Sequence, residues 1–149
     1  MDFDFSDFYP LVVAWAEAQV AEAASKGTPL DEDGLALARK MGVEHPELVR
    51  VWMRDQLPTP EHPVLVKINE VVRLINPHMA GLTLGHTIII RNGCANPLLL
   101  AHELRHVHQY EQEGSIAAFL ETYLRQILMH GYNDAPYERD ANEHARQAR

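Results

Sequence analysis

The stretch NPLLLAHELRHVHQYEQEG, residues 96–114, constrains the fold of this chain more than any other segment. Asn96 can cap a helix, Pro97 suits its first position and Gly114 can end it, so the pattern predicts one continuous helix. Side chains on a helix repeat about every 3.6 residues, so the directions of the polar residues in this segment are known relative to one another.

Two histidines of this helix, His102 and His106, lie four residues apart and therefore face the same side, one turn from each other. Leu98 and Leu99 lie on that side too, so we expect a buried apolar stripe that continues into both imidazoles. Histidines on such a face need polar partners, and a zinc ion can satisfy both. A chance arrangement of solvated side chains is the alternative, and the apolar approach argues against it.

The segment HELRH matches the H-E-x-x-H pattern, in which two histidines bind zinc and the glutamate serves as general base. Glu103 lies about 100° around the helix from His102, so we expect its carboxylate beside the metal rather than bound to it. There it can accept a proton from a metal-bound water. The pattern therefore predicts Zn²⁺ as cofactor, with His102 and His106 as ligands and Glu103 as the catalytic base.

A catalytic zinc site also needs a third protein ligand and one open position. His108 cannot supply it, because it lies about 240° around the helix from His102, and Glu113 is about 16 Å along the axis. Glu138 and Asn142 share one face of a predicted C-terminal helix, so one can bind the metal while the other supports a ligand histidine. Periodicity also leaves open other residues: His78, His86, His130, Asp140, Glu143 and His144.

The rest of the chain divides into further helices and short strands. Helices are predicted over residues 6–26, 30–43, 63–75, 115–130 and from 136 onward. Strands are predicted over 81–84 and 87–91, as a hairpin or a bent strand, and over 48–58, where a helix is the alternative. This order predicts an α+β fold with a small mixed or antiparallel sheet. An N-terminal helical extension (1–45) precedes a metallopeptidase-like core (46–149).

Charge and composition limit the kinds of partner. The chain carries 13 Lys and Arg against 21 Asp and Glu, so neither a phosphate-binding surface nor a helix-turn-helix DNA reader in the first two helices is expected. The single cysteine, Cys94, excludes an internal disulfide. The acidic N-terminus lacks the basic part of a signal peptide, and no apolar run reaches the roughly 20 residues of a membrane helix. We expect a cytoplasmic protein without nucleic-acid or membrane partners.

From Ala101 to Ala145 the chain resembles the small gluzincin metallopeptidases, including the minigluzincins and short bacterial HExxH proteins. The matching segments are AHELRHVHQYE and GYNDAPYERDAN, with an amphipathic helix between them. The resemblance implies Glu138 as third zinc ligand. Asn142 stands where thermolysin-like members place an acid that supports a ligand histidine. The resemblance also implies that HTIIIR is an edge strand, and that Thr87, Ile88 and Ile89 pair with an extended peptide substrate.

Together these features predict a zinc metallopeptidase that hydrolyses a peptide or protein substrate, with Glu103 as general base. The site could be latent if the N-terminal helices or the C-terminal tail cover it. The alternative is a non-catalytic interaction module in which zinc fastens the last helix to the core, although the presence of Glu103 favours an enzyme. The sequence does not choose among four candidate donors to the oxyanion: His86, Tyr110, Tyr132 and Tyr137.

Overall fold

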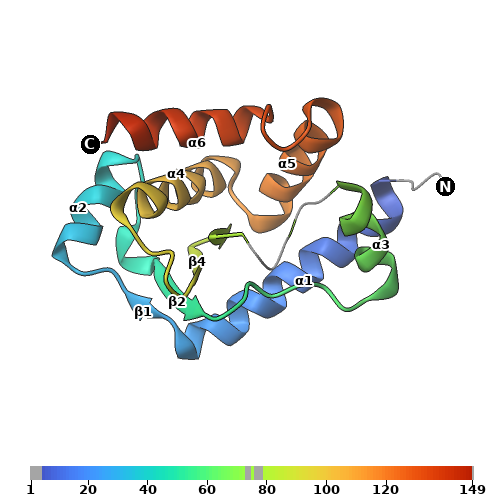
Figure 1. Ribbon diagram of the computed structural model, residues 1–149, viewed down its shortest axis with the longest axis horizontal. Coiled ribbons are helices and arrows are strands. Elements are labelled where there is room, and N and C mark those ends of the chain that lie inside the picture. Colours follow the sequence, from blue (N-terminus) through green and yellow to red (C-terminus); the bar gives the residue numbers. More distant parts are fainter. Residues whose placement is uncertain (1–4, 73–74, 76–78, 149) are drawn as a thin grey trace.

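A four-stranded mixed sheet forms the centre of the computed structural model, which describes residues 5–72, 75 and 79–148 (Figure 1). Its central pair of strands is parallel, and the two outer strands are antiparallel to their neighbours. With helices around this sheet, the predicted α+β class is confirmed. In spatial order the strands are β1 (Thr28–Pro29), β2 (Arg50–Arg54), β4 (Thr87–Arg91) and β3 (Gly81–Leu84).

Six α-helices in the described part of the chain surround the sheet. The predicted helix over 96–114 is confirmed: the Asn96 side chain accepts the Leu99 N–H at 2.9 Å, and Gly114 ends the helix with a left-handed φ of 94°. Among the described residues, no helix is both long and apolar enough to cross a membrane. The helices are α1 (Phe5–Lys26), α2 (Glu32–Lys40), α3 (Pro63–Val72), α4 (Pro97–Glu113), α5 (Ile116–His130) and α6 (Pro136–Gln147), with a 3₁₀ turn at Pro46–Leu48.

Strand β4 lies inside the sheet, so the prediction that HTIIIR forms an exposed edge is wrong. Its backbone pairs with β2 on one side and with β3 on the other. Ile88 and Ile90 pack toward α4, and Ile89 packs against Ala23 of α1 on the opposite face. A run of adjacent β-branched residues buried on both faces is typical of an interior strand. The backbones of Thr87, Ile88 and Ile89 are therefore not free to pair with a substrate.

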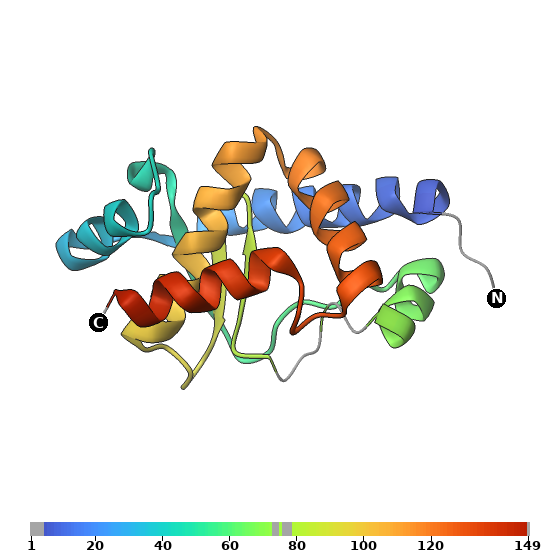
Figure 2. The same cartoon turned by 90° about the horizontal axis from the view of Figure 1, so that it is seen from above.

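Helix α4 lies between the sheet and α6, while α1 covers the opposite face of the sheet (Figures 1 and 2). Leu104 and Val107 of α4 pack on the sheet, and Ala101 packs with Ala145 of α6 in the same apolar cluster. This central position buries two ionisable residues of α4, Glu103 and His106. The fold therefore places the HELRH segment in the middle of the molecule.

The loop after α2 is fastened to the back of α4 by three polar side chains at three-residue intervals. All three bond to the backbone of residues 41–45, and His108 thus points away from His102, as the helical spacing predicts. Residues of α2 and of this loop also share the apolar cluster with Leu104 and Val107. Arg105 Nη1 donates to the Met41 carbonyl (3.0 Å), and His108 Nδ1 lies 2.9 Å from the Gly42 carbonyl. The Glu111 carboxylate accepts the N–H groups of Glu44 (2.7 Å) and His45 (3.0 Å).

Replacing Glu111 with alanine should lower the free energy of unfolding by about 1–2 kcal/mol, because the N–H groups of Glu44 and His45 lose their acceptor. Burial alone would raise the pKa of Glu111, but those N–H groups and the His86 ring hold this pKa below its ordinary value. Urea denaturation followed by circular dichroism measures the change. Glu70→Ala, on an exposed surface of α3, is the control and should change stability by less than about 0.5 kcal/mol. Equal effects of the two substitutions would contradict the prediction.

Candidate metal centre

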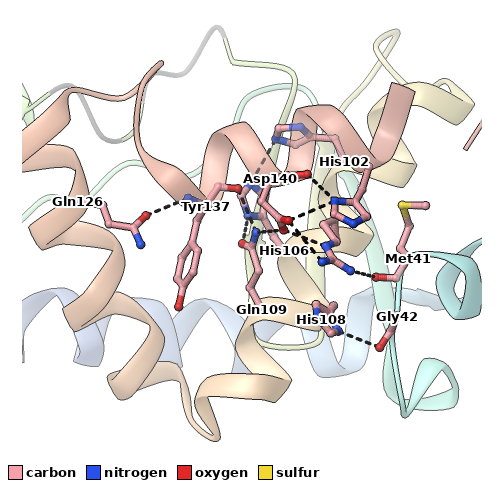
Figure 3. Close-up of polar contacts among 11 residues, drawn as sticks. Met41, Gly42, His102, His106, His108, Gln109, Gln126, Tyr137 and Asp140 are labelled. Carbon is pink, nitrogen blue, oxygen red and sulfur yellow. Dashed lines mark hydrogen bonds and ion pairs between the residues drawn. The ribbon is translucent and has the colours of Figure 1, made fainter. Parts of the chain in front are cut away.

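Two histidines of α4 and one glutamate of α6 meet where these helices pack together. His102 and His106 lie one turn apart on α4 (Figure 3). Glu138 is in the first turn of α6. The two Nε2 atoms are 3.2 Å apart, and Glu138 oxygens lie 3.2 Å from His102 Nε2 and 2.8 Å from His106 Nε2. The three donor atoms lie within 4.8 Å of one another, so this group can hold a metal ion.

The other candidate ligands lie elsewhere. Among the described residues, His102, His106 and Glu138 are the only set of three or more His, Cys, Asp or Glu with this geometry. His78 lies outside the described residues. The remaining candidates are engaged or exposed: His86 with Glu111 (2.9 Å), His144 with Asp140 (3.1 Å), Glu113 with the Tyr137 hydroxyl, and Glu143 and His130 at the surface.

The buried charges of His106 and Glu138 compensate one another. Burial alone would lower the pKa of His106, but its hydrogen bond to Glu138 and the charges of Glu138 and Glu103 raise this pKa to about 9. Burial would raise the pKa of Glu138, yet hydrogen bonds from His102 and His106 hold it well below its ordinary value. At neutral pH His106 is therefore a cation and Glu138 an anion. A metal ion must displace the imidazole proton in order to bind.

A glutamine that the sequence analysis did not single out orients His106. Gln109 places its Oε1 atom 2.7 Å from His106 Nδ1 (Figure 3). Its NH₂ group donates to the Tyr137 carbonyl (3.0 Å) and to Asp140 Oδ2 (2.8 Å), so its oxygen must face the imidazole. His106 therefore carries a proton on Nδ1 and directs Nε2 toward Glu138, as a metal-binding histidine requires. The spacing of three residues from His106 was the available sequence signal.

Asn142 does not support a ligand histidine, so that prediction is wrong. The residue is exposed, and the described hydrogen bonds connect it to no histidine. Gln109 occupies Nδ1 of His106, and the Tyr123 hydroxyl of α5 donates to Glu138 at 2.6 Å. Outer support of the site thus comes from α4 and α5, and Asn142 lines the neighbouring cleft instead.

Glu103 is buried beside the histidines without belonging to the three-residue group. Its Oε1 accepts a hydrogen bond from the Thr83 hydroxyl of β3 at 2.9 Å, and its Oε2 lies 3.9 Å from His102 Nε2. Gly81 of the same strand leaves space for the carboxylate, since a Cβ there would lie 3.3 Å from it. Thr83 therefore holds one oxygen while the other faces the site. No sequence spacing indicates this contact, because it depends on the packing of α4 against β3.

A cleft of about 620 Å³ opens beside this site. Its walls are the residues just before β3, the first turns of α4, the turn before α6, and α6 itself. Leu98 lines the cleft and is 37% exposed, so the prediction that it extends a buried stripe is wrong. This side of α4 forms a wall open to solvent rather than core. No residue of the described segment 5–45 lines the cleft, so the N-terminal helices do not cover it.

One tyrosine among the four predicted oxyanion donors is placed at the site. Tyr132, in the turn between α5 and α6, lines the cleft beside Glu103 and Glu138. Burial and the charges of those two residues raise the pKa of Tyr132 far above its ordinary value, so its hydroxyl remains a donor at neutral pH. The other three donate or pair elsewhere: Tyr110 to the Thr83 carbonyl, Tyr137 to Glu113, and His86 to Glu111.

The site thus combines three atoms that can hold a metal ion, a nearby carboxylate and a protonated phenol at an open cleft. These groups are sufficient to bind a metal ion and to move a proton beside it. Comparisons of the chain with family models, with curated proteins and with solved structures find no match.

Replacing Glu138 with alanine should weaken metal binding by at least roughly a hundredfold, because two histidines alone leave the ion without a third protein ligand. Titration of the metal-free protein with Co²⁺, followed by visible absorption, measures the affinity. Glu143→Ala is the matched control, since Glu143 is an exposed acid of the same helix. Retained binding in Glu138→Ala with loss in Glu143→Ala would overturn the assignment.

Metal binding near pH 7 should release about one proton from His106, because the pKa of this imidazole is about 9 before the ion arrives. Affinity should therefore increase as the pH rises toward 9, and the proton release from His106 should disappear above it. Calorimetric titration in buffers of different ionisation enthalpy counts the protons. A count that stays constant from neutral pH to well above 9 would contradict this prediction.

Proposed function

We propose that this protein is a zinc-dependent peptidase in which Glu103 is the general base. The position of the Glu103 carboxylate carries the proposal: it is buried, held by Thr83, and 3.9 Å from a nitrogen of the metal-binding group. Burying a carboxylate is costly unless it is paired or hydrogen-bonded, and here Thr83 holds one oxygen while the other faces the metal-binding group. The resemblance of residues 101–145 to the gluzincins agrees with the proposal.

Zinc suits this set of donors. In a tetrahedral site, nitrogen and oxygen ligands about 2.0–2.2 Å from Zn²⁺ lie about 3.3–3.5 Å from one another. The two imidazole Nε2 atoms, 3.2 Å apart, are close to that spacing. The two oxygens of Glu138 lie 3.2 Å from His102 Nε2 and 2.8 Å from His106 Nε2, so the carboxylate faces both imidazoles. Two imidazoles and one carboxylate, with a cleft at the fourth position, are also the ligand set of many catalytic zinc sites.

Each residue around the centre then has a defined task. Bound zinc would polarise a peptide carbonyl and lower the pKa of water. Glu103 Oε2 accepts the proton of the attacking water and passes it to the leaving amine, while Thr83 keeps Oε1 in place. Tyr132 donates a hydrogen bond to the carbonyl oxygen as negative charge develops there.

We assign substrate alignment to the outer strand β3 instead of β4. The Ala80 carbonyl accepts the Arg91 N–H of β4 at 2.8 Å, whereas the Thr83 carbonyl faces the other way and accepts the Tyr110 hydroxyl at 3.1 Å. Backbone directions alternate along a strand, so the N–H and C=O groups of Gly81 share the outward direction of Thr83. Gly81 lines the cleft, where an extended peptide can pair with it next to Glu103.

A purely structural metal is the second candidate function. The donor atoms come from both α4 and α6, so an ion would also fasten the last helix to the rest of the fold. In that case the protein is a zinc-stabilised interaction module, and Glu103 has no chemical task. The two candidates differ in what a substitution of Glu103 changes.

Glu103→Gln should keep zinc and lose hydrolysis by at least about a hundredfold, because the amide cannot accept the water proton. The measurements are zinc content by mass spectrometry of metals and cleavage of a fluorogenic peptide library. Glu143→Gln, an exposed carboxylate of α6, should behave as wild type in both. If zinc-loaded wild type cleaves no peptide, yet loses thermal stability when the metal is removed, the interaction-module candidate replaces the enzyme.

A further inference from the structure

Three residues of α6 line the same side of the cleft at four-residue intervals: Glu138, Asn142 and Arg146. Residues spaced in this way follow one another along a single face of a helix. Glu138 belongs to the metal centre, and Asn142 is an exposed amide beside it. Arg146 therefore extends the same wall away from the metal. The C-terminal end of α6, which carries it, lies beside the first turns of α4 (Figure 2).

The charge of this wall differs from that of the protein. The chain has 21 acidic and 13 basic residues, yet no acidic side chain lines the cleft apart from Glu103 and Glu138. Arg146 is the one other charged residue among the described lining residues. The arginine ion pairs in the described part of the chain are Arg105–Asp140 and Arg125–Glu121, so Arg146 has no carboxylate partner there.

The backbone that carries Arg146 is held in place. Its neighbour Ala145 is buried in the apolar cluster of α4, and the Ala148 carbonyl accepts the Lys40 ammonium at 3.2 Å. Arg139 and Arg146 are both exposed, but only Arg146 lines the cleft. Arg146 thus stands beside the cleft at a fixed helix end, and the described ion pairs give its guanidinium no carboxylate partner.

The distance between Arg146 and the metal centre determines which part of a bound substrate the guanidinium can reach. Arg146 is two helical turns beyond Glu138, about 12 Å along the axis. Its side chain tilts back toward the helix N-terminus, which shortens the gap. An extended peptide advances about 3.3 Å per residue. The guanidinium is therefore suited to a group two or three residues from the peptide bond at the metal.

We infer that Arg146 binds a carboxylate of the substrate and thereby determines specificity, an inference that rests on the proposed peptidase function. Guanidinium groups pair with carboxylates through two parallel hydrogen bonds. The carboxylate is either an acidic side chain or a free C-terminus two or three residues from the cleaved bond. Asn142 lines the space between together with Leu98, Leu99 and Ala145, so the intervening substrate residues would meet one amide and three apolar side chains.

Cleavage profiling of a mixed pool of synthetic octapeptides tests the inference. Wild type should favour Asp or Glu at one position, or a free over an amidated C-terminus, two or three residues from the cut. Arg146→Gln should remove the preference and raise KM for those peptides roughly tenfold with little change in kcat. Arg146→Glu should replace the preference for an acidic substrate residue with a preference for Lys or Arg at the same position. Arg139→Gln, an exposed arginine of the same helix, should keep the wild-type profile.

Binding measured without turnover separates this inference from the proposed function. Zinc-loaded Glu103→Gln should bind a fluorescent peptide with the carboxylate more tightly than its Asn or amidated counterpart, and adding Arg146→Gln should abolish the difference. Cleavage by wild type without any carboxylate preference would overturn the role of Arg146 and leave the peptidase standing. If the protein cleaves no peptide but binds the peptide with the carboxylate more tightly, the peptidase function is overturned and the role of Arg146 stands. Absence of both overturns this inference as well.

Discussion

The pairing of Glu138 with His102 and His106 is the interaction on which the rest of the structure depends. It buries a carboxylate, which is strongly destabilising without a positive partner. A protonated imidazole is that partner in the metal-free protein, and a metal ion takes its place in the proposed enzyme. Both states require α4 and α6 to keep one relative position. The same contact therefore sets the separation of the two helices that form the walls of the cleft.

Helix α4 serves several neighbours at once, which is why a single apolar stripe does not describe it. One side packs on the sheet, one carries the histidines and Glu103, and one forms hydrogen bonds to the loop of residues 41–45. Asp140 of α6 joins the last two, because it accepts both from Arg105 and from Gln109 at 2.8 Å. Gln109, which orients His106, is thus connected through Asp140 and Arg105 to Met41, so the candidate metal centre is supported by α6 and by the loop of residues 41–45.

The proposed substrate path follows from the same packing. β3 offers an outward-facing backbone at Gly81, Glu103 lies next to it, and the cleft continues along α6 to Arg146. In the proposed enzyme, β3 aligns the peptide, the metal centre cleaves it and the arginine selects it. These tasks fall on separate elements, so each can be altered by substitution without removing the others.

Local pattern alone determined the α4 helix and its caps, the two short strands on either side of Gly85, the start of α6 at Pro136, and the spacing of HELRH. These features depend on residues within one or two turns of each other, where backbone geometry is nearly constant. Tertiary structure decided that β4 is interior and β3 outer, that Thr83 holds Glu103, and that Gln109 rather than Asn142 supports His106. It also brought Glu138, and not Glu143, to the histidines. Such choices depend on which apolar faces of distant segments bury one another, and that long-range packing leaves no periodic trace in the sequence.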